Sequence, residues 1–150
     1  MATVDVEVHA TIGRSRPEVA AYACDPDNVT TWYANIKAVR WETTPPVTLG
    51  SRFRFTSEFL GRRLDYTYEV VEFVPAQRFV MRSDQGPFPM ETTYAWEDAP
   101  EEATWMTLRN RGEPTAFAGL AAPLLATAIR RATSKDLARL KSLLEAANLS

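Results

Sequence analysis

The sequence has 150 residues, 45% of them hydrophobic and 11% aromatic, which is typical of a globular protein and excludes a disordered chain. Lys and Arg number 17 against 19 Asp and Glu, so the formal net charge of −2 lacks the basic excess of a dedicated nucleic-acid-binding protein. We therefore expect a single domain over residues 1–150 with no nucleic-acid partner.

No segment of the sequence is suited to secretion or to a membrane span. Cys24 is the only cysteine, so no internal disulfide can form and a reducing compartment fits. The first residues carry charges where a signal peptide needs an apolar run. The longest apolar stretch, Ala116 to Ile129, is too short to cross a bilayer and contains Pro123. We expect a cytoplasmic protein without stable membrane insertion, and the sequence does not specify an oligomeric state.

The first part of the chain predicts one strand followed by two short helices. Thr3 to Ile12 alternates apolar and polar residues, which indicates a strand with one buried face. A short helix is expected from Pro17 to Ala23, because a serine precedes it in the N-cap position and a proline occupies its first turn. Asp25 to Asp27 then ends this helix and caps a second one, which runs through Trp32 or Tyr33.

Six further strands are expected, most of them joined by short turns. Gly61-Arg62 has the length of a tight hairpin turn between two of them. Val70-Val71 interrupts the alternation of the next strand and therefore predicts a β-bulge. Sequential strands with short turns form an antiparallel meander, so the fold class is α+β. The expected strands are 36–43, 52–60, a strand containing 64–73, 78–83, 90–97 and 104–111.

The C-terminal stretch Phe117 to Leu149 predicts one long amphipathic helix, about 45 Å long at about 1.5 Å per residue. Its apolar residues recur at helical spacing, and its charged residues, Asp136 among them, are expected mostly on the other side. Pro123 lacks a backbone donor, so it either kinks the helix or marks a fresh start. We expect the helix to close the concave side of the curved sheet.

The order of these elements resembles the helix-grip fold of the Bet v 1, START and polyketide-cyclase superfamily (SRPBCC). The stretches that are similar to its bacterial polyketide cyclase/dehydrase branch are R-P-E-V-A-A-Y (16–22), D-P-D-N-V-T-T-W-Y (25–33), Y-E-V-V-E-F-V-P-A-Q-R-F-V-M-R (68–82) and D-L-A-R-L-K-S-L-L-E (136–145). The resemblance implies a curved antiparallel sheet of about seven strands around the C-terminal helix, with a deep apolar cavity between them. Roles in the superfamily include lipid and hormone binding, ubiquinone-related binding and aromatic polyketide cyclisation.

The inward faces of the expected strands carry many aromatic side chains and several polar ones. A filled core is the plain interpretation of an aromatic stripe. A buried polar group without a partner costs about 1–3 kcal/mol, however, so several of them facing one space favour a hydrated or ligand-filled cavity. We expect a cavity of at least about 300 Å³, between the sheet and Phe117 to Ile129. The candidate ligand-binding residues are Trp32, Tyr33, Trp41, Phe53, Phe55, Ser57, Tyr66, Tyr68, Phe79, Met81, Met90, Thr92, Tyr94, Asn110, Phe117, Leu120 and Leu124.

The sequence offers little for metal or cofactor chemistry. His9 is the only histidine, and strand parity places it on the convex face of the sheet. Cys24 is expected to be a small buried hydrophobe. One histidine and one cysteine without clustered carboxylates do not match the common zinc patterns, so we expect no metal site and no cofactor. The strand carboxylates are expected on outward faces, paired with arginines: Glu58, Asp65, Glu69 and Glu91.

Three classes of function remain open at this point. The preferred one is binding of a hydrophobic small molecule, such as a lipid, a polyketide or an aromatic metabolite. The competing one is a polyketide cyclase or aromatase, in which Tyr66, Tyr68 and Tyr94 would donate hydrogen bonds or act as acids. No inward His, Asp or Glu is expected to serve as a base, so the enzyme hypothesis is less favoured than ligand binding. The third is an interaction module without a ligand, which a cavity too small for a drug-sized molecule would favour.

Overall fold

The structure, a computed structural model, describes residues 3–83, 89–113 and 119–146. Its elements occur in the expected order of one strand, short helices, six strands and a long helix. They are β1 Val4–Ile12, α1 Arg16–Cys24, the 3₁₀ helix η1 Pro26–Asn28, α2 Val29–Trp32, β2 Ile36–Trp41, β3 Arg52–Phe59, β4 Arg62–Val74, β5 Arg78–Ser83, β6 Met90–Ala99, β7 Ala103–Gly112 and α3 Ala122–Ala146.

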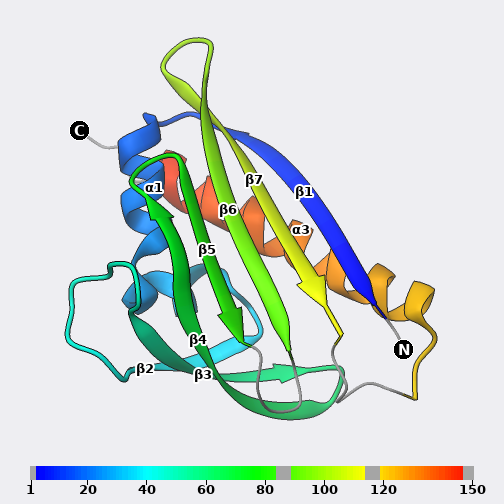
Figure 1. The fold of residues 1–150 in the computed structure, drawn as a ribbon. Helices are drawn as coiled ribbons and strands as arrows, with labels where there is room; N and C mark the ends of the chain where they lie inside the picture. The colour runs from blue at the N-terminus through cyan, green and yellow to red at the C-terminus, as the bar shows by residue number, and fades with distance from the viewer. Residues whose placement is uncertain (1–2, 84–88, 114–118, 147–150) are drawn as a thin grey trace.

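The seven strands form one curved antiparallel sheet in the order β1-β7-β6-β5-β4-β3-β2. In Figure 1 the helix α3, coloured orange to red, crosses one face of this sheet. Helix α1 follows the C-terminal end of β1 and lies near that end of the sheet. Strand β1 lies at one edge of the sheet, where its only strand neighbour is β7. Helix α3 packs extensively along β1. The expected α+β helix-grip arrangement is confirmed.

The alternation of β1 has the predicted effect on burial. Val4, Val6 and Ile12 are buried beneath the sheet, while His9 between them is exposed on the outer face. There the His9 ring stacks on Trp105, with ring centroids 5.0 Å apart. The expected surface position of this histidine is confirmed.

One turn and one bulge of the meander test the sequence-based expectations. The hairpin between β3 and β4 turns on Leu60-Gly61, not on the expected Gly61-Arg62, because Arg62 already pairs with Phe59 in the ladder. Leu60 has φ 51° and Gly61 has φ 78°, the positive angles that a tight hairpin turn demands at both central positions. The predicted bulge is confirmed, since the β4–β5 register shifts between Val70 and Glu72.

Helix α3 begins at Ala122, and the expectation of one helix from Phe117 is wrong at this end. Residues 119–121 are not helical, and 117–118 and 147–149 lie outside the described residues. Pro123 falls in the first turn, where its missing N–H costs nothing, and the amides of Leu124 and Leu125 both donate to the Ala121 carbonyl at 3.1 Å. The proline therefore marks a fresh start, and the helix is about 37 Å long at about 1.5 Å per residue.

The buried face of α3 also differs from the expected stripe. Leu124, a candidate ligand-binding residue from the sequence, is 66% exposed, and Leu120 before the helix is 39% exposed. The residue next to Leu124, Leu125, is fully buried instead. Adjacent positions point about 100° apart on a helix, so a shift of one residue turns a side chain out of the core. The buried positions are Leu125, Ile129, Thr133, Asp136, Leu137, Leu140 and Leu144.

The outer face of the sheet carries ion pairs between strands, as expected. Glu91 accepts from Arg82 at 2.8 Å and from Arg111 at 3.0 Å, and Arg109 binds Asp5 at 2.6 Å. These arginines hold the pKa values of Glu91 and Asp5 below the usual range for carboxyl groups. Among the described residues, no helix combines the length and apolar character needed to cross a membrane.

The burial of α3 gives a test of stability within one helix. Leu140 is fully buried, so Leu140→Ala should lower the free energy of unfolding by about 2–5 kcal/mol. Leu124 is 66% exposed, so Leu124→Ala should cost less than about 0.5 kcal/mol. Urea unfolding of both variants measures the difference. Similar losses of stability from the two variants would contradict the observed orientation of α3, in which Leu140 is buried and Leu124 is exposed.

Candidate functional site

A cavity of about 90 Å³ lies between the concave face of the sheet and the middle of α3. All strands except β1 contribute to its wall, and α2 and the segment after it close one side. The aromatic and aliphatic side chains make the wall mainly apolar, and hydroxyl, amide and carboxyl groups interrupt it. The lining residues are Val29, Tyr33, Asn35, Ile36, Phe55, Ser57, Phe59, Leu64, Tyr66, Tyr68, Met81, Met90, Thr92, Tyr94, Asn110, Ile129, Ala132, Thr133 and Asp136.

The expected size and position of the cavity both need correction. It was expected to reach at least about 300 Å³, the lower end for ligand pockets, but its volume is about 90 Å³. Large inward rings such as those of Phe53, Phe79 and Trp32 pack so closely that they fill much of the space under the sheet. Its helical wall runs from Ile129 to Asp136, so it meets the expected wall, Phe117 to Ile129, only at Ile129 and extends further along the chain.

A chain of four hydrogen-bonded side chains crosses the cavity wall from the sheet to α3. The Thr92 hydroxyl donates to Asn110 Oδ1 at 2.7 Å, and Asn110 Nδ2 donates to Thr133 Oγ1 at 3.2 Å. Because Thr92 has only one hydroxyl hydrogen, the 3.1 Å bond between Tyr68 and Thr92 is donated by Tyr68. The chain therefore runs in one direction, and the hydroxyl hydrogen of Thr133 remains available to another acceptor.

A second polar group consists of Tyr33 and Tyr94, whose hydroxyl oxygens lie 2.7 Å apart. Burial raises the pKa of both phenols well above the usual 10, and the charge of Asp136 adds to the effect. Burial likewise raises the pKa of Tyr68 to about 12 and increases that of Tyr66. The four tyrosines are therefore neutral at physiological pH and act as hydrogen-bond donors and acceptors, not as bases.

Asp136 brings a carboxyl group into this interior. Its residue is only 5% exposed, and its Oδ1 accepts a hydrogen bond from the Ala34 amide at 3.0 Å. Burial raises the pKa of Asp136 to about 6, although the Ala34 hydrogen bond and the nearby Arg139 charge oppose the shift. The expectation that Asp136 lies on the polar side of the helix is wrong, and so is the expectation that no carboxylate faces inward.

The burial of Asp136 had a signal in the sequence. It stands three residues after Thr133, seven after Ile129 and four before Leu140, and all three are buried. Residues at these spacings share one face of a helix. The charge of the side chain suggested solvent, whereas its position in the helical repeat indicated the core.

The structure places ten of the seventeen candidate residues on the cavity wall. They are Tyr33, Phe55, Ser57, Tyr66, Tyr68, Met81, Met90, Thr92, Tyr94 and Asn110. Phe117 lies outside the described residues. The remaining six are absent from the wall formed by described residues: Trp32, Trp41, Phe53, Phe79, Leu120 and Leu124.

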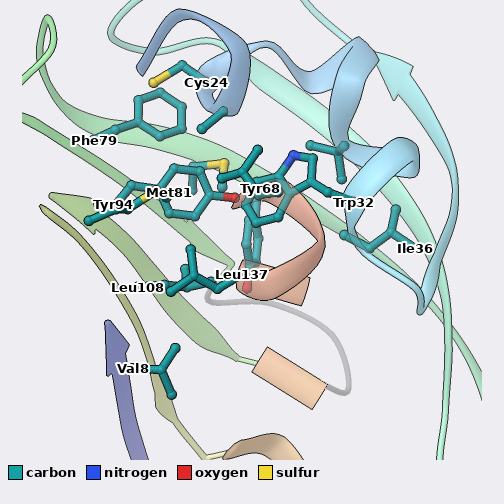
Figure 2. Packing of buried hydrophobic residues seen from close by; sticks show 14 of the residues in the cluster. Val8, Cys24, Trp32, Ile36, Tyr68, Phe79, Met81, Tyr94, Leu108 and Leu137 are labelled. Carbon is teal, nitrogen blue, oxygen red and sulfur yellow. The ribbon is translucent and has the colours of Figure 1, made fainter. Parts of the chain in front are cut away.

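Trp32 and Trp41 occupy different places behind this wall. Figure 2 shows Trp32 from α2 and Tyr94 from β6 pointing toward one another, and their ring centroids are 5.7 Å apart. Trp32 also packs on Tyr33 at 4.3 Å, so it supports the tyrosine pair from outside the cavity. Trp41 instead packs edge-on against Phe53 at 5.0 Å, and its indole N–H donates to Asp27 at 3.0 Å.

Nine lining residues were not among the seventeen candidates. The strand residues among them follow the same inward parity as the aromatic set, as Leu64 and Phe59 do. The others come from α2, the segment after it and α3, where the register of the helix decides which side chain reaches the cavity. The missed residues are Val29, Asn35, Ile36, Phe59, Leu64, Ile129, Ala132, Thr133 and Asp136.

The described residues bring no three His, Cys, Asp or Glu side chains together as a metal site would require. Cys24 is 6% exposed, and burial raises the pKa of its thiol to about 12. A thiol of this kind stays protonated and is a weak nucleophile. The expectation of a small buried hydrophobe at this position is confirmed.

The raised pKa of Asp136 predicts a defined pH dependence of stability. Between an unfolded value near 3.8 and the folded value of about 6, the folded state binds more protons, so stability falls as pH rises through this window. Asp136→Asn keeps an oxygen for the Ala34 amide and removes the charge. It should raise the free energy of unfolding by about 1–3 kcal/mol at about pH 7.5, and this gain should shrink toward about pH 4.

Urea unfolding of both proteins across this pH range measures the gain, and taking the difference cancels the titration of all other groups. A gain that is the same at every pH would mean that the Asp136 carboxyl is solvated in the folded protein. A loss of stability at about pH 7.5 would mean that the ionised form is favourably paired.

Comparisons with known proteins were consistent with the geometry. The fold matches a START superfamily protein of Mycobacterium smegmatis with a TM-score of 0.83 and 13% identity over 96% of this chain and 99% of that one. A protein of Thermus thermophilus matches with a TM-score of 0.81 and 19% sequence identity, over 96% of this chain and 99% of that one. The Zhui aromatase/cyclase of Streptomyces sp. R1128 matches with a TM-score of 0.74 and 16% sequence identity, over 95% of this chain and 94% of that one. At these identities the likeness shows the fold alone.

No curated protein sequence matches this chain significantly. A sequence profile does match it, over residues 3–145, and that profile describes polyketide cyclases, dehydrases and lipid transport proteins. The match spans every strand and nearly all of α3. The chain therefore belongs to the polyketide cyclase/dehydrase and lipid transport family.

Proposed function

We propose that this protein binds a small hydrophobic molecule in the cavity between the sheet and α3. The observation that carries the proposal is the mixed wall of the cavity, in which apolar rings surround a buried carboxyl group and a set of hydroxyls. Binding sites for small molecules are mostly apolar concave spaces with a few converging polar groups that fix orientation. The family membership supports the same role.

The buried carboxyl argues against a space that is only a packing defect. An ionised group inside an apolar core is costly, and a core built for stability alone avoids it. Among the described residues, Asp136 accepts one hydrogen bond, from the Ala34 amide, and forms no ion pair with a Lys or Arg. Proteins accept such local costs at sites that bind or react, so Asp136 supports a ligand site.

The volume of about 90 Å³ limits the ligand or requires the cavity to open. A space of this size holds about three waters at about 30 Å³ each, which is less than a drug-sized ligand needs. Helix α3 packs most extensively against β1, whereas the cavity separates it from the strands further along the sheet. A displacement of α3 away from those strands would enlarge the space without breaking the contact with β1.

The small volume is also the observation that favours an interaction module without a ligand. Such a module needs its interior only for packing, and its binding surface lies outside. The directed hydrogen-bond chain and the inward carboxyl have no purpose in that account. We therefore rank ligand binding first and leave the interaction module as the outcome of a negative binding experiment.

An enzyme of the polyketide cyclase or aromatase type is the second candidate. Asp136 favours it, because a carboxyl with a pKa of about 6 suits proton transfer near neutral pH. Tyr33 and Tyr94 next to it can donate a hydrogen bond to a developing oxyanion. Zhui is named an aromatase/cyclase, and its fold is similar. We assign no other catalytic residue.

The setting that we propose for this function is the cytoplasm. The buried thiol of Cys24 is compatible with a reducing compartment. The near balance of charge gives no reason to expect a nucleic-acid partner. We further propose that residues 1–150 act as one domain, since β1 pairs with β7 and α3 packs along β1, which joins the two ends of the described chain.

Native mass spectrometry of the protein purified without denaturation tests ligand binding. We expect a bound molecule that is retained by the wild type and lost from Ala132→Phe, because Ala132 lines the cavity and a phenyl ring there fills it. Ala138→Phe is the matched control, since Ala138 is exposed on the same helix. It should retain the molecule.

Circular dichroism of both variants must show the native fold for the comparison to hold. If the molecule persists in Ala132→Phe, it binds elsewhere and the proposed site is wrong. If the wild type carries nothing and binds no small apolar probe, the interaction module is favoured.

The bound molecule then separates a binder from an enzyme. Incubation of the released molecule with fresh protein should leave its mass unchanged if the protein only binds it. A cyclase or dehydrase would change the mass or the absorption spectrum, and Asp136→Asn would slow that conversion by at least about tenfold if Asp136 moves the proton. Conversion at the full rate by this variant would exclude Asp136 from the chemistry.

A further inference from the structure

Asp136 is the one charged side chain among the described residues that line the cavity. Every other polar group on that wall is a neutral hydroxyl or amide, including Ser57, Asn35 and Asn110. No Lys or Arg on the described wall therefore stands ready to receive an acidic ligand. Arg139, whose charge acts on Asp136, is exposed and donates to the Thr31 carbonyl at 3.0 Å.

The electrostatic environment inside the cavity is thus negative when Asp136 is ionised. Charges interact more strongly in a small interior space than in bulk water, because little solvent screens them there. The hydroxyls of Tyr33 and Tyr94 are hydrogen-bonded to each other, which uses one of their two hydrogens. At most one hydroxyl hydrogen is therefore left to donate to the Asp136 carboxylate and offset its charge. The Ala34 amide supplies a single further donor.

Aromatic rings surround the same space. A cation is attracted to the face of an aromatic ring by its quadrupole, and recognition of organic ammonium groups commonly combines several such rings. A carboxylate beside such rings adds a hydrogen-bond acceptor and a full opposite charge. The rings on this wall are those of Tyr33, Phe55, Phe59, Tyr66, Tyr68 and Tyr94.

We propose that the cavity selects hydrophobic ligands whose polar end is a protonated amine, which pairs with the Asp136 carboxylate among the tyrosine and phenylalanine rings. Ligands that end in a carboxylate or a phosphate are disfavoured, since they place a second negative charge beside Asp136. Ligands with a neutral hydroxyl fall between the two. This inference rests on the proposed ligand-binding function of the same cavity and names the chemical class that it takes.

The preference for an amine depends on pH in a direction that the site fixes. Above about pH 6 the Asp136 carboxyl is ionised and attracts the cation, and below that value it is increasingly protonated. The facing phenols of Tyr33, Tyr66, Tyr68 and Tyr94 do not titrate in this range, because burial raises their pKa values, and the nearby charged group is the Arg139 guanidinium. An alkyl amine also keeps its proton, so the preference fades as pH falls.

Three probes that share one phenyl ring and differ in their polar end test the selection: benzylamine, benzyl alcohol and benzoate. Nuclear magnetic resonance titration of the ¹⁵N-labelled protein gives each dissociation constant, and the Ala34 amide reports on Asp136 directly because it donates to that carboxylate. At about pH 7.5 we expect benzylamine to bind at least about tenfold more tightly than benzyl alcohol, with benzoate weakest. This advantage should shrink at about pH 5.

Asp136→Asn isolates the charge, since asparagine keeps the shape and an acceptor for the Ala34 amide. In this variant benzylamine should lose at least about tenfold in affinity, while benzyl alcohol changes less than about threefold. Glu58→Gln is the matched control, because Glu58 is exposed on the outer face of β3 and the substitution removes the same charge. It should leave the order of the three probes unchanged.

The outcomes separate this inference from the function on which it rests. If benzyl alcohol binds at the cavity but benzylamine binds no more tightly, the amine class is wrong and ligand binding stands. If Asp136→Asn weakens all three probes equally, Asp136 supports the cavity without selecting charge, and the inference again falls. If no probe shifts the resonances of cavity residues, the proposed function and the inference fall together.

Discussion

The fold depends on one requirement, which is that the apolar face of α3 be buried against the concave side of the sheet. The pairing of β1 with β7 makes this possible, because it brings the N-terminal strand next to the strand that precedes the helix. The side chains of Leu125, Leu137 and Leu140 are almost completely buried in this contact. Between Ile129 and Asp136 the rings of the sheet do not close the space entirely, and a cavity of about 90 Å³ remains there.

The polar groups of the cavity follow from this arrangement. The continuous sheet supplies Tyr68, Thr92 and Asn110 from three strands, and the helix completes their hydrogen-bond chain with Thr133. One turn further along, Asp136 enters the same space and is held by the Ala34 amide, which follows α2. Burial there raises the pKa of the carboxyl, so an interior tolerated by the fold carries a group that can attract or transfer a proton.

The sequence predicted features that depend on local pattern and missed those that depend on phase and on volume. The alternation of β1 and the bulge at Val70 were readable because strand parity has a period of two. The start of α3 was placed too early, and Asp136 was placed on the wrong face of the helix. One residue along a helix turns a side chain by about 100°, and the charge of Asp136 was given more weight than its position in the helical repeat. The size of the cavity depends on how Trp32 and Phe79 pack, which no single-sequence pattern specifies.

The central claim is that the interior of this fold holds a carboxyl group shielded from water. The most direct measurement is a nuclear magnetic resonance titration of the Asp136 side-chain carboxyl carbon in the folded protein. The structure predicts an apparent pKa of about 6, well above the ordinary value of 3.8. A value at or below 3.8 would show that Asp136 is solvated or paired with a cation, and it would contradict the account of the cavity.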